Sequence, residues 1–218
     1  MGSGKGNKSM LKKYYSAVGL IALVLTLSGC ASTTPLTMKS RNAIQVVAVI
    51  PEVEMPDQLV YQGGAQSIGL AFGLIGGVLG SVASTGPAER FAAFMEESEI
   101  YVDQIVYSEF IAEFDQAGLF TRKDSGSVDA EIRLEVQLYG LTQVHGLSSR
   151  LHPQIAVQST MVDASGNVVW QEHHRVPPMG AGVPAYSAAE YTENPELLRQ
   201  AMHAAAQLVS RGLIDSIR

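Results

Sequence analysis

The amino-acid sequence predicts an α+β domain in which a mainly antiparallel sheet packs against two long helices on one face. Apolar and polar residues alternate strictly over residues 128–138, which is the period of a strand with one wet face. Two further strand-like runs, 155–162 and 168–170, flank the turn at 163–166 and predict a hairpin. Helical patterns lie on both sides of these strands in the sequence, so a two-layer sandwich is expected.

The remaining elements are predicted in chain order. Residues 44–50 read as a first strand with both faces partly buried. The spacing of apolar residues over 89–117 predicts one long helix that stops at Gly118. The last helix is expected to begin at Asn194-Pro195, with asparagine as its cap and proline at its first position.

Composition limits the classes of function. The 218 residues are 46% hydrophobic and 17% charged, which is enough apolar side chain for one sizeable core. The net charge is −6, so the chain lacks the basic surface that binding to a phosphate backbone needs. We therefore expect no nucleic-acid partner.

The only cysteine, Cys30, directly follows a short apolar run. Lys12 and Lys13 precede this run, residues 17–27 form it, and small residues stand before the cysteine, as in a secretory signal peptide. The run is too short to span the ~30 Å hydrocarbon core of a bilayer comfortably. The ending Leu27-Ser28-Gly29-Cys30 resembles the lipobox of bacterial lipoproteins.

This resemblance implies a division of the chain into three parts. Residues 1–29 would be a lipoprotein signal peptide, for which Met10 is a more typical start than Met1. Residues 30–41 would comprise the lipidated cysteine and an extended tether, and residues 42–218 one periplasmic α+β domain. The resemblance also implies diacylglycerol and an N-acyl chain on Cys30, and we expect no other cofactor.

The implied anchor sets the expected location. Ala31 and Ser32 follow the cysteine without an aspartate, which resembles the pattern of lipoproteins sent on to the outer membrane. Removal of residues 1–29 takes away four lysines and no acid, leaving 11 basic and 21 acidic side chains and a net charge of −10. Such a body is repelled by anionic lipid, so the acyl chains are the expected attachment to membrane lipid.

The overall layout gives a second, broader resemblance. A lipobox is followed by a strand, a helix ending in FDQAGLF, a strand, the hairpin VDASGNVVWQE and the closing helix LLRQAMHAAAQLV. This order resembles small periplasmic α+β lipoproteins, among them auxiliary lipoproteins of envelope transporters and activators of cell-wall synthases. It implies a non-enzymatic accessory or assembly factor with a protein partner in the envelope.

An uncharged, glycine-rich run lies between Asp57 and Glu89. Its glycines recur at four-residue spacing, which lets helices approach closely. About 16 apolar or small residues give roughly 24 Å of helix, short of a ~30 Å span. The sequence favours a helical insertion over 63–86 that packs on the membrane or on other copies; a buried glycine-rich insertion and a single span are the alternatives. The predicted contact residues are Gly69, Phe72, Gly73, Gly76, Gly77 and Gly80.

The sequence lacks the common motifs of catalysis. It contains no nucleophile elbow, phosphate-binding loop or His-Glu-x-x-His motif, and the only cysteine is assigned to lipid, so we expect no catalytic residue. His173 and His174 are adjacent in a strand and should point to opposite faces, which disfavours a shared metal. Solvated positions are expected for His145 and His152, and a solvated helix face for Glu96, Glu97, Glu99 and Asp103.

Partner contacts are predicted at three positions. Trp170 is the only tryptophan and would either anchor a partner or pack on a helix. Met179 and Tyr186 belong to the connection 177–193, which would either dock another envelope protein or cover the sheet. The first functional hypothesis is thus an accessory lipoprotein. The alternative is a membrane-active homo-oligomer whose glycine-rich segment packs on or inserts into the bilayer.

Overall fold

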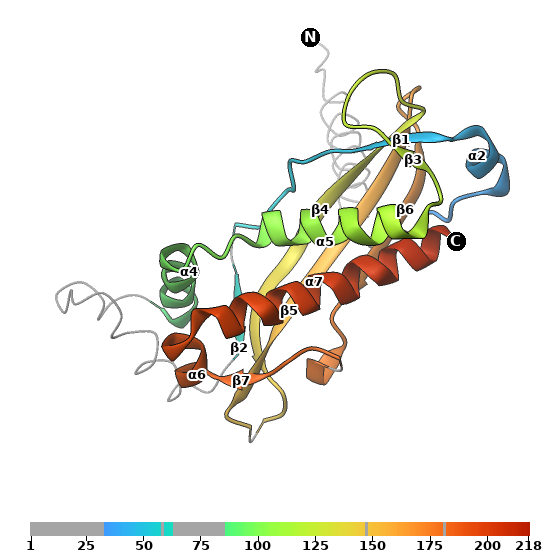
Figure 1. The fold of residues 1–218 in the computed structure, drawn as a ribbon. Helices are drawn as coiled ribbons and strands as arrows, with labels where there is room; N and C mark the ends of the chain where they lie inside the picture. The colour runs from blue at the N-terminus through green and yellow to red at the C-terminus, as the bar shows by residue number, and fades with distance from the viewer. Residues whose placement is uncertain (1–32, 58, 63–85, 147, 181) are drawn as a thin grey trace, which may run out of the picture. The chain divides into compact units, whose positions relative to one another are not determined.

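The computed structural model describes residues 33–57, 59–62, 86–146, 148–180 and 182–218 (Figure 1). The described residues belong to one compact unit, residues 33–218. Cys30 and the predicted contact residues of the glycine-rich insertion lie outside the described residues. Within the described ranges, no helix combines the length and the apolar composition needed to cross a bilayer.

The centre of the domain is a mixed sheet of seven strands. The strand order is β3-β1-β4-β5-β6, with β2 paired to β4 and β7 paired to β5. Pairing among β4, β5, β6 and β7 is antiparallel, whereas β1, β2 and β3 form parallel pairs. The strands are β1 (Val46–Val49), β2 (Val60–Gln62), β3 (Thr121–Arg122), β4 (Ala130–Gln143), β5 (Arg150–Asp163), β6 (Val168–Arg175) and β7 (Tyr186–Ser187).

Two long helices cover one face of this sheet. The helices α5 (Val102–Ala117) and α7 (Pro195–Ile217) lie side by side across the strands (Figure 1). Fully buried apolar side chains fill the space between the layers, among them Phe110, Ile132, Val157 and Val209. The predicted α+β fold is confirmed. The shorter helices are α2 (Met38–Ala43), α4 (Pro87–Glu97), α6 (Ala188–Glu193) and the 3₁₀ turn η2 (Pro178–Gly180).

The predicted single helix over 89–117 is wrong, because the chain breaks into α4 and α5. Glu99 has φ 53°, the left-handed conformation that usually selects glycine at a helix end. Its N–H bonds the carbonyl oxygen of Glu96 at 3.0 Å, and the Ile100 N–H bonds that of Met95 at 2.8 Å. This is the paired bonding of a Schellman ending, completed by the buried side chain of Ile100. The predicted stop, Gly118, is the C-cap of α5 with φ 60°.

Strands β4 and β5 are both longer than the sequence predicts. A register shift between Val136 and Leu138 interrupts the alternation of β4, after which the strand continues to Gln143. Strand β5 begins at Arg150, five residues before the predicted start at Ile155, and passes through Pro153. Neither β6 nor β7 pairs with β5 at Pro153, so the missing N–H of this proline costs no ladder bond.

The connection 177–193 is more regular than predicted. It contains η2, β7 and α6. A capping box begins α6: the Ser187 side chain accepts from the Glu190 N–H, and the Glu190 carboxylate accepts from the Ser187 N–H at 2.8 Å. Buried Tyr191 donates its hydroxyl to the Leu151 carbonyl oxygen at 3.0 Å and ties α6 to β5.

Candidate functional site

The first described residues are attached to the edge of the sheet. The Thr34 N–H donates to the carbonyl oxygen of Gln171 at 2.8 Å, and the Gln171 N–H donates back to Thr34 at 2.9 Å. Thr34 thereby forms an antiparallel bridge with the edge strand β6. We call this bridge, together with the anchoring contacts of Arg41 and Asp129, the tether dock.

The rest of the tether dock satisfies backbone hydrogen-bonding groups at the ends of α2, α7 and β1. Thr37 caps α2 by accepting the Ser40 N–H, and the Arg41 guanidinium donates to the last carbonyl oxygens of α7, those of Ile217 (2.5 Å) and Arg218. The Asp129 carboxylate accepts the N–H groups of Gln45 (2.9 Å) and Val46 (2.8 Å), and these bonds lower the pKa of Asp129. A bridge and a helix thus occupy the region where the sequence predicts an extended tether.

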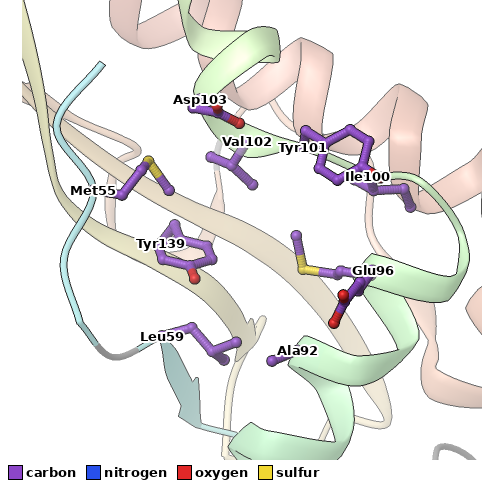
Figure 2. Close-up of a pocket in the computed structure, with 10 residues that line it drawn as sticks. Met55, Leu59, Ala92, Glu96, Ile100, Tyr101, Val102, Asp103 and Tyr139 are labelled. Atoms are coloured by element: carbon purple, nitrogen blue, oxygen red, sulfur yellow. The ribbon is translucent and has the colours of Figure 1, made fainter. Parts of the chain in front are cut away.

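An apolar groove lies at the other end of the domain, between α4, the segment before β2 and strand β4 (Figure 2). We call it the α4 groove. Two adjoining cavities of about 180 and 360 Å³ form it and share Leu59, Ala92 and Tyr139. Its other lining residues are Met55, Asp57, Ala88, Glu89, Met95, Glu96, Ile100, Tyr101, Val102 and Asp103.

The strand β2 reaches the groove because of a glycine in β4. Val60 pairs with Gly140, where a Cβ atom would lie 1.7 Å from the Val60 carbonyl oxygen. Gly140 also has φ 151°, so this position needs glycine for space and for conformation. The pairing holds the adjacent Leu59 at the groove. Tyr61 of β2 contacts Phe91 of α4 edge to face, with ring centroids 6.1 Å apart.

The other wall of the α4 groove is held by α7. The Arg199 guanidinium donates to the carbonyl oxygens of Ser98 (2.8 Å) and Glu99 (2.9 Å), which would otherwise lack helical partners. Glu196 pairs with the same guanidinium at 3.1 Å. This contact fixes the turn between α4 and α5, from which Ile100 and Tyr101 enter the groove wall.

Charge and exposure distinguish the α4 groove from the rest of the surface. Glu96 and Asp103 line the smaller cavity and Asp57 and Glu89 the larger one, while none of the described lining residues is a lysine, arginine or histidine. Met55 and Tyr101 are 38% and 45% exposed and line one cavity together, whereas the other exposed large apolar side chains of the described residues lie outside the groove. Burial raises the pKa of Tyr139, so its hydroxyl stays neutral.

The predicted partner contacts do not meet at this groove. Trp170 is 1% exposed and donates its indole N–H to the Ser216 hydroxyl at 3.3 Å, so it packs on α7, one of the two roles that the sequence left open. Met179 is 69% exposed with φ 69°. Tyr186 is half-buried against Tyr191, with ring centroids 5.6 Å apart. Only Met179 offers a large exposed surface.

The histidines occupy varied environments. His173 pairs with Gln158 and His174 with Val157, so the two side chains lie on opposite faces, as predicted. The expectation of a solvated His152 is wrong: it is fully buried under Gly180, where a Cβ atom would lie 2.4 Å from the ring. Burial lowers the pKa of His152. Among the residues that the structure describes, no three His, Cys, Asp or Glu side chains are grouped to hold a metal ion.

Sequence patterns do not identify the groove residues Met55, Leu59, Tyr101 and Tyr139. They come from three separate segments, and no local pattern marks them. Of the four helix carboxylates noted in the sequence, Glu96 and Asp103 line the groove, whereas Glu97 and Glu99 are exposed outside its lining.

No family model and no curated protein sequence matches this chain. Solved structures of similar fold include a Xanthomonas campestris protein with 11% identity and a TM-score of 0.43, aligned over 84% of this chain and 87% of that one. A PelC dodecamer from Paraburkholderia phytofirmans has 12% identity, a TM-score of 0.41 and coverage of 86% and 96%. A minor lipoprotein from Acinetobacter baumannii has 10% identity, a TM-score of 0.34 and coverage of 78% and 92%. Similarity at this level does not transfer function.

Proposed function

We propose that this chain is a lipid-anchored protein of the bacterial envelope that acts without catalysis, as an accessory or assembly factor that contacts another protein. The observation that carries the proposal is the sequence Leu27-Ser28-Gly29-Cys30 after a signal-like apolar run. The absence of an aspartate after Cys30 favours the outer membrane, with the body in the periplasm. The lack of catalytic motifs in the sequence supports a non-enzymatic role.

The tether dock gives such an anchor a structural consequence. Thr34 is four residues beyond Cys30, and four extended residues reach at most about 14 Å. A lipid on Cys30 would therefore keep the edge strand β6 close to the bilayer surface. Because the chain from Thr34 to Val46 is bonded to the body, the anchor would restrain the orientation of the domain as well as its location.

Fractionation of cells tests the anchor. Cys30→Ser should abolish incorporation of labelled palmitate and move the protein out of the membrane pellet, while the neighbouring Ser32→Ala should change neither. Ala31→Asp should shift the protein from the outer-membrane to the inner-membrane fraction. Retention of the Cys30→Ser protein in the membrane pellet would contradict the proposal.

The second candidate is a membrane-active homo-oligomer. The four-residue spacing of Gly69, Gly73 and Gly77 within an uncharged run favours it. Crosslinking followed by mass measurement of the purified lipoprotein separates the two candidates. A heterologous partner on a monomeric body supports the accessory factor, and a closed homo-oligomer that Gly73→Leu disrupts supports the alternative.

A further inference from the structure

We infer that the α4 groove binds a segment of a partner protein that presents an apolar side chain next to lysine or arginine. The inference rests on the proposed function in one respect, that the partner is an envelope protein. The recognition chemistry itself comes from the groove.

The apolar part of the inference rests on shape and lining. Ala92 of α4 and Leu59 face each other across the opening, and Met55, Tyr139 and Val102 surround the space (Figure 2). The smaller cavity, about 180 Å³, suits a single large side chain, and the larger one, about 360 Å³, continues from it along α4. Covering Met55 and Tyr101 would remove exposed apolar surface from water, which favours association.

The ionic part rests on the charges around the opening. The carboxylates of Asp57, Glu89, Glu96 and Asp103 come from three segments, and no cationic side chain stands among the described lining residues. The nearby Arg199 is engaged by Glu196 and by backbone carbonyl oxygens. A lysine or arginine beside the inserted side chain would find complementary charge, and a carboxylate there would be repelled.

Other occupants fit the groove less well. The glycine-rich run of this chain has no charged residue to match the carboxylates. Anionic lipid headgroups would be repelled. A second copy could offer Met38, which is 70% exposed and precedes Lys39.

Met38 of the same copy cannot reach the groove. It lies in α2 at the tether dock, and the dock and the groove wall contact opposite ends of α7 at Ile217 and Arg199. These residues are separated by about 27 Å of helix at ~1.5 Å per residue. A second copy would have to bring its tether dock to the groove, an outcome that the oligomeric state of Ala92→Trp tests.

Peptide binding to the purified full-length protein in detergent micelles tests the inference. The probe is a fluorescein-labelled peptide of about 12 residues with a central Leu-Leu pair flanked by lysines, followed by anisotropy. Matched peptides replace the lysines with glutamates or the leucines with serines. We expect the Leu-Lys peptide to bind at least tenfold more tightly than either, with affinity falling as salt rises.

Variants on α4 locate the binding. Ala92→Trp fills the groove and should weaken binding of the Leu-Lys peptide at least tenfold, whereas Ala93→Trp, at an exposed neighbour outside the lining, should not. Glu96→Lys should weaken binding severalfold more than Glu97→Lys, whose side chain is exposed outside the lining. Circular dichroism should show the same helix content in all four variants.

Three outcomes would overturn the inference: equal binding of the glutamate peptide, unchanged binding to both Ala92→Trp and Glu96→Lys, or a wild-type homo-oligomer that Ala92→Trp dissociates. The last would identify a second copy as the occupant. The Cys30→Ser protein should bind the peptide like the wild type, because Cys30 is not among the groove residues. If the peptide binds and the Cys30→Ser protein still stays in the membrane, the lipid anchor is contradicted but the groove assignment is not.

Discussion

The tether dock and the α4 groove, at opposite ends of the domain, differ in whether their polar groups find partners within the chain. At the tether dock, exposed backbone groups are satisfied within the chain, through Thr34 on the edge strand and Arg41 on the last carbonyl oxygens of α7. At the α4 groove, Met55 and Tyr101 are partly exposed, and the lining carboxylates have no basic side chain beside them among the described lining residues. Because Met38 at the dock is also exposed, the contrast lies in the charges: the charged groups of the dock are paired within the chain, whereas the groove presents carboxylates to a partner.

The helix α7 connects the two ends. Near its N-terminus, Arg199 bonds the turn between α4 and α5 beside the groove. At its C-terminus, Ile217 and Arg218 accept the guanidinium of Arg41 in the dock. Because α7 is buried along one side against the sheet, it acts as a stiff spacer between the two sites. Three changes test the difference between the two ends.

Gly140→Ala should have the largest effect, because it disrupts the backbone pairing of β2 with β4 beside the groove. A Cβ atom 1.7 Å from the Val60 carbonyl oxygen has no space, so β2 must leave β4. We expect a loss of about 3 kcal/mol in the free energy of unfolding, from overpacking and strain together. Denaturant unfolding measures the loss, and hydrogen exchange should show β2 amides deprotected.

The control for this variant is Gly126→Ala. Gly126 also has positive φ, 96°, but a Cβ atom there would meet nothing within 4 Å. Gly126→Ala should lower the free energy of unfolding by about 1 kcal/mol, from conformational strain alone. Equal losses for the two variants would show that the close approach of β2 is unimportant.

Arg41→Ala should loosen the dock without affecting the groove. The two carbonyl oxygens at the end of α7 lose a charged donor, which we expect to cost about 1 kcal/mol at this partly exposed site. Limited proteolysis should cut the segment around α2 faster, while affinity for the Leu-Lys peptide stays unchanged. Lys39→Ala, two residues away and outside the contacts that define the dock, is the matched control; equal proteolysis of both variants would argue against the role of Arg41.

Acid should affect the groove end before the dock. His152 of β5 pairs with Thr142 of β4, and Thr142 also pairs with Gln62 of β2. Since burial lowers its pKa below the ordinary 6.5, the unfolded chain takes up a proton first, and stability falls as pH drops below 6.5. Asp129 has a pKa below its ordinary 3.8, so its contribution is present above 3.8 and is lost only at lower pH.

Hydrogen exchange at pH 7 and pH 5, corrected for intrinsic rates, checks this order. Amides of β2 and the adjoining part of β5 should lose protection at pH 5, while those of β1 and α2 keep theirs. The exposed His145→Asn should leave the pattern unchanged and His152→Asn should reduce the pH dependence. Simultaneous loss of protection at both ends would contradict the assignment.

Much of the fold could be predicted from local patterns. The alternation in β4, the turn at 163–166 and the cap Asn194 are chemistry within a few residues, and each corresponds to the element found. The errors arose where tertiary contacts override local preference. Glutamate at a left-handed helix end separates α4 from α5, and Pro153 continues a strand because it pairs with Leu141 of β4 while neither β6 nor β7 pairs with it.

The candidate sites were less predictable than the fold. The dock depends on contacts such as Arg41 with Ile217, which are far apart in the sequence. The groove gathers Met55, Tyr101 and Tyr139 from separate segments, so no spacing rule could place them together. Cys30, by contrast, is marked by a contiguous motif and needs no tertiary information.

Photocrosslinking in intact cell envelopes tests the contrast between the two ends most directly. A benzophenone side chain replaces the partly exposed Tyr101 at the groove wall or Met38 beside the dock, in the otherwise unchanged protein. We expect crosslinks from position 101 to a different protein, through a peptide with lysine or arginine next to an apolar residue, and few from position 38. Crosslinks from position 101 to copies of this chain, or protein partners found at position 38 alone, would contradict this expectation.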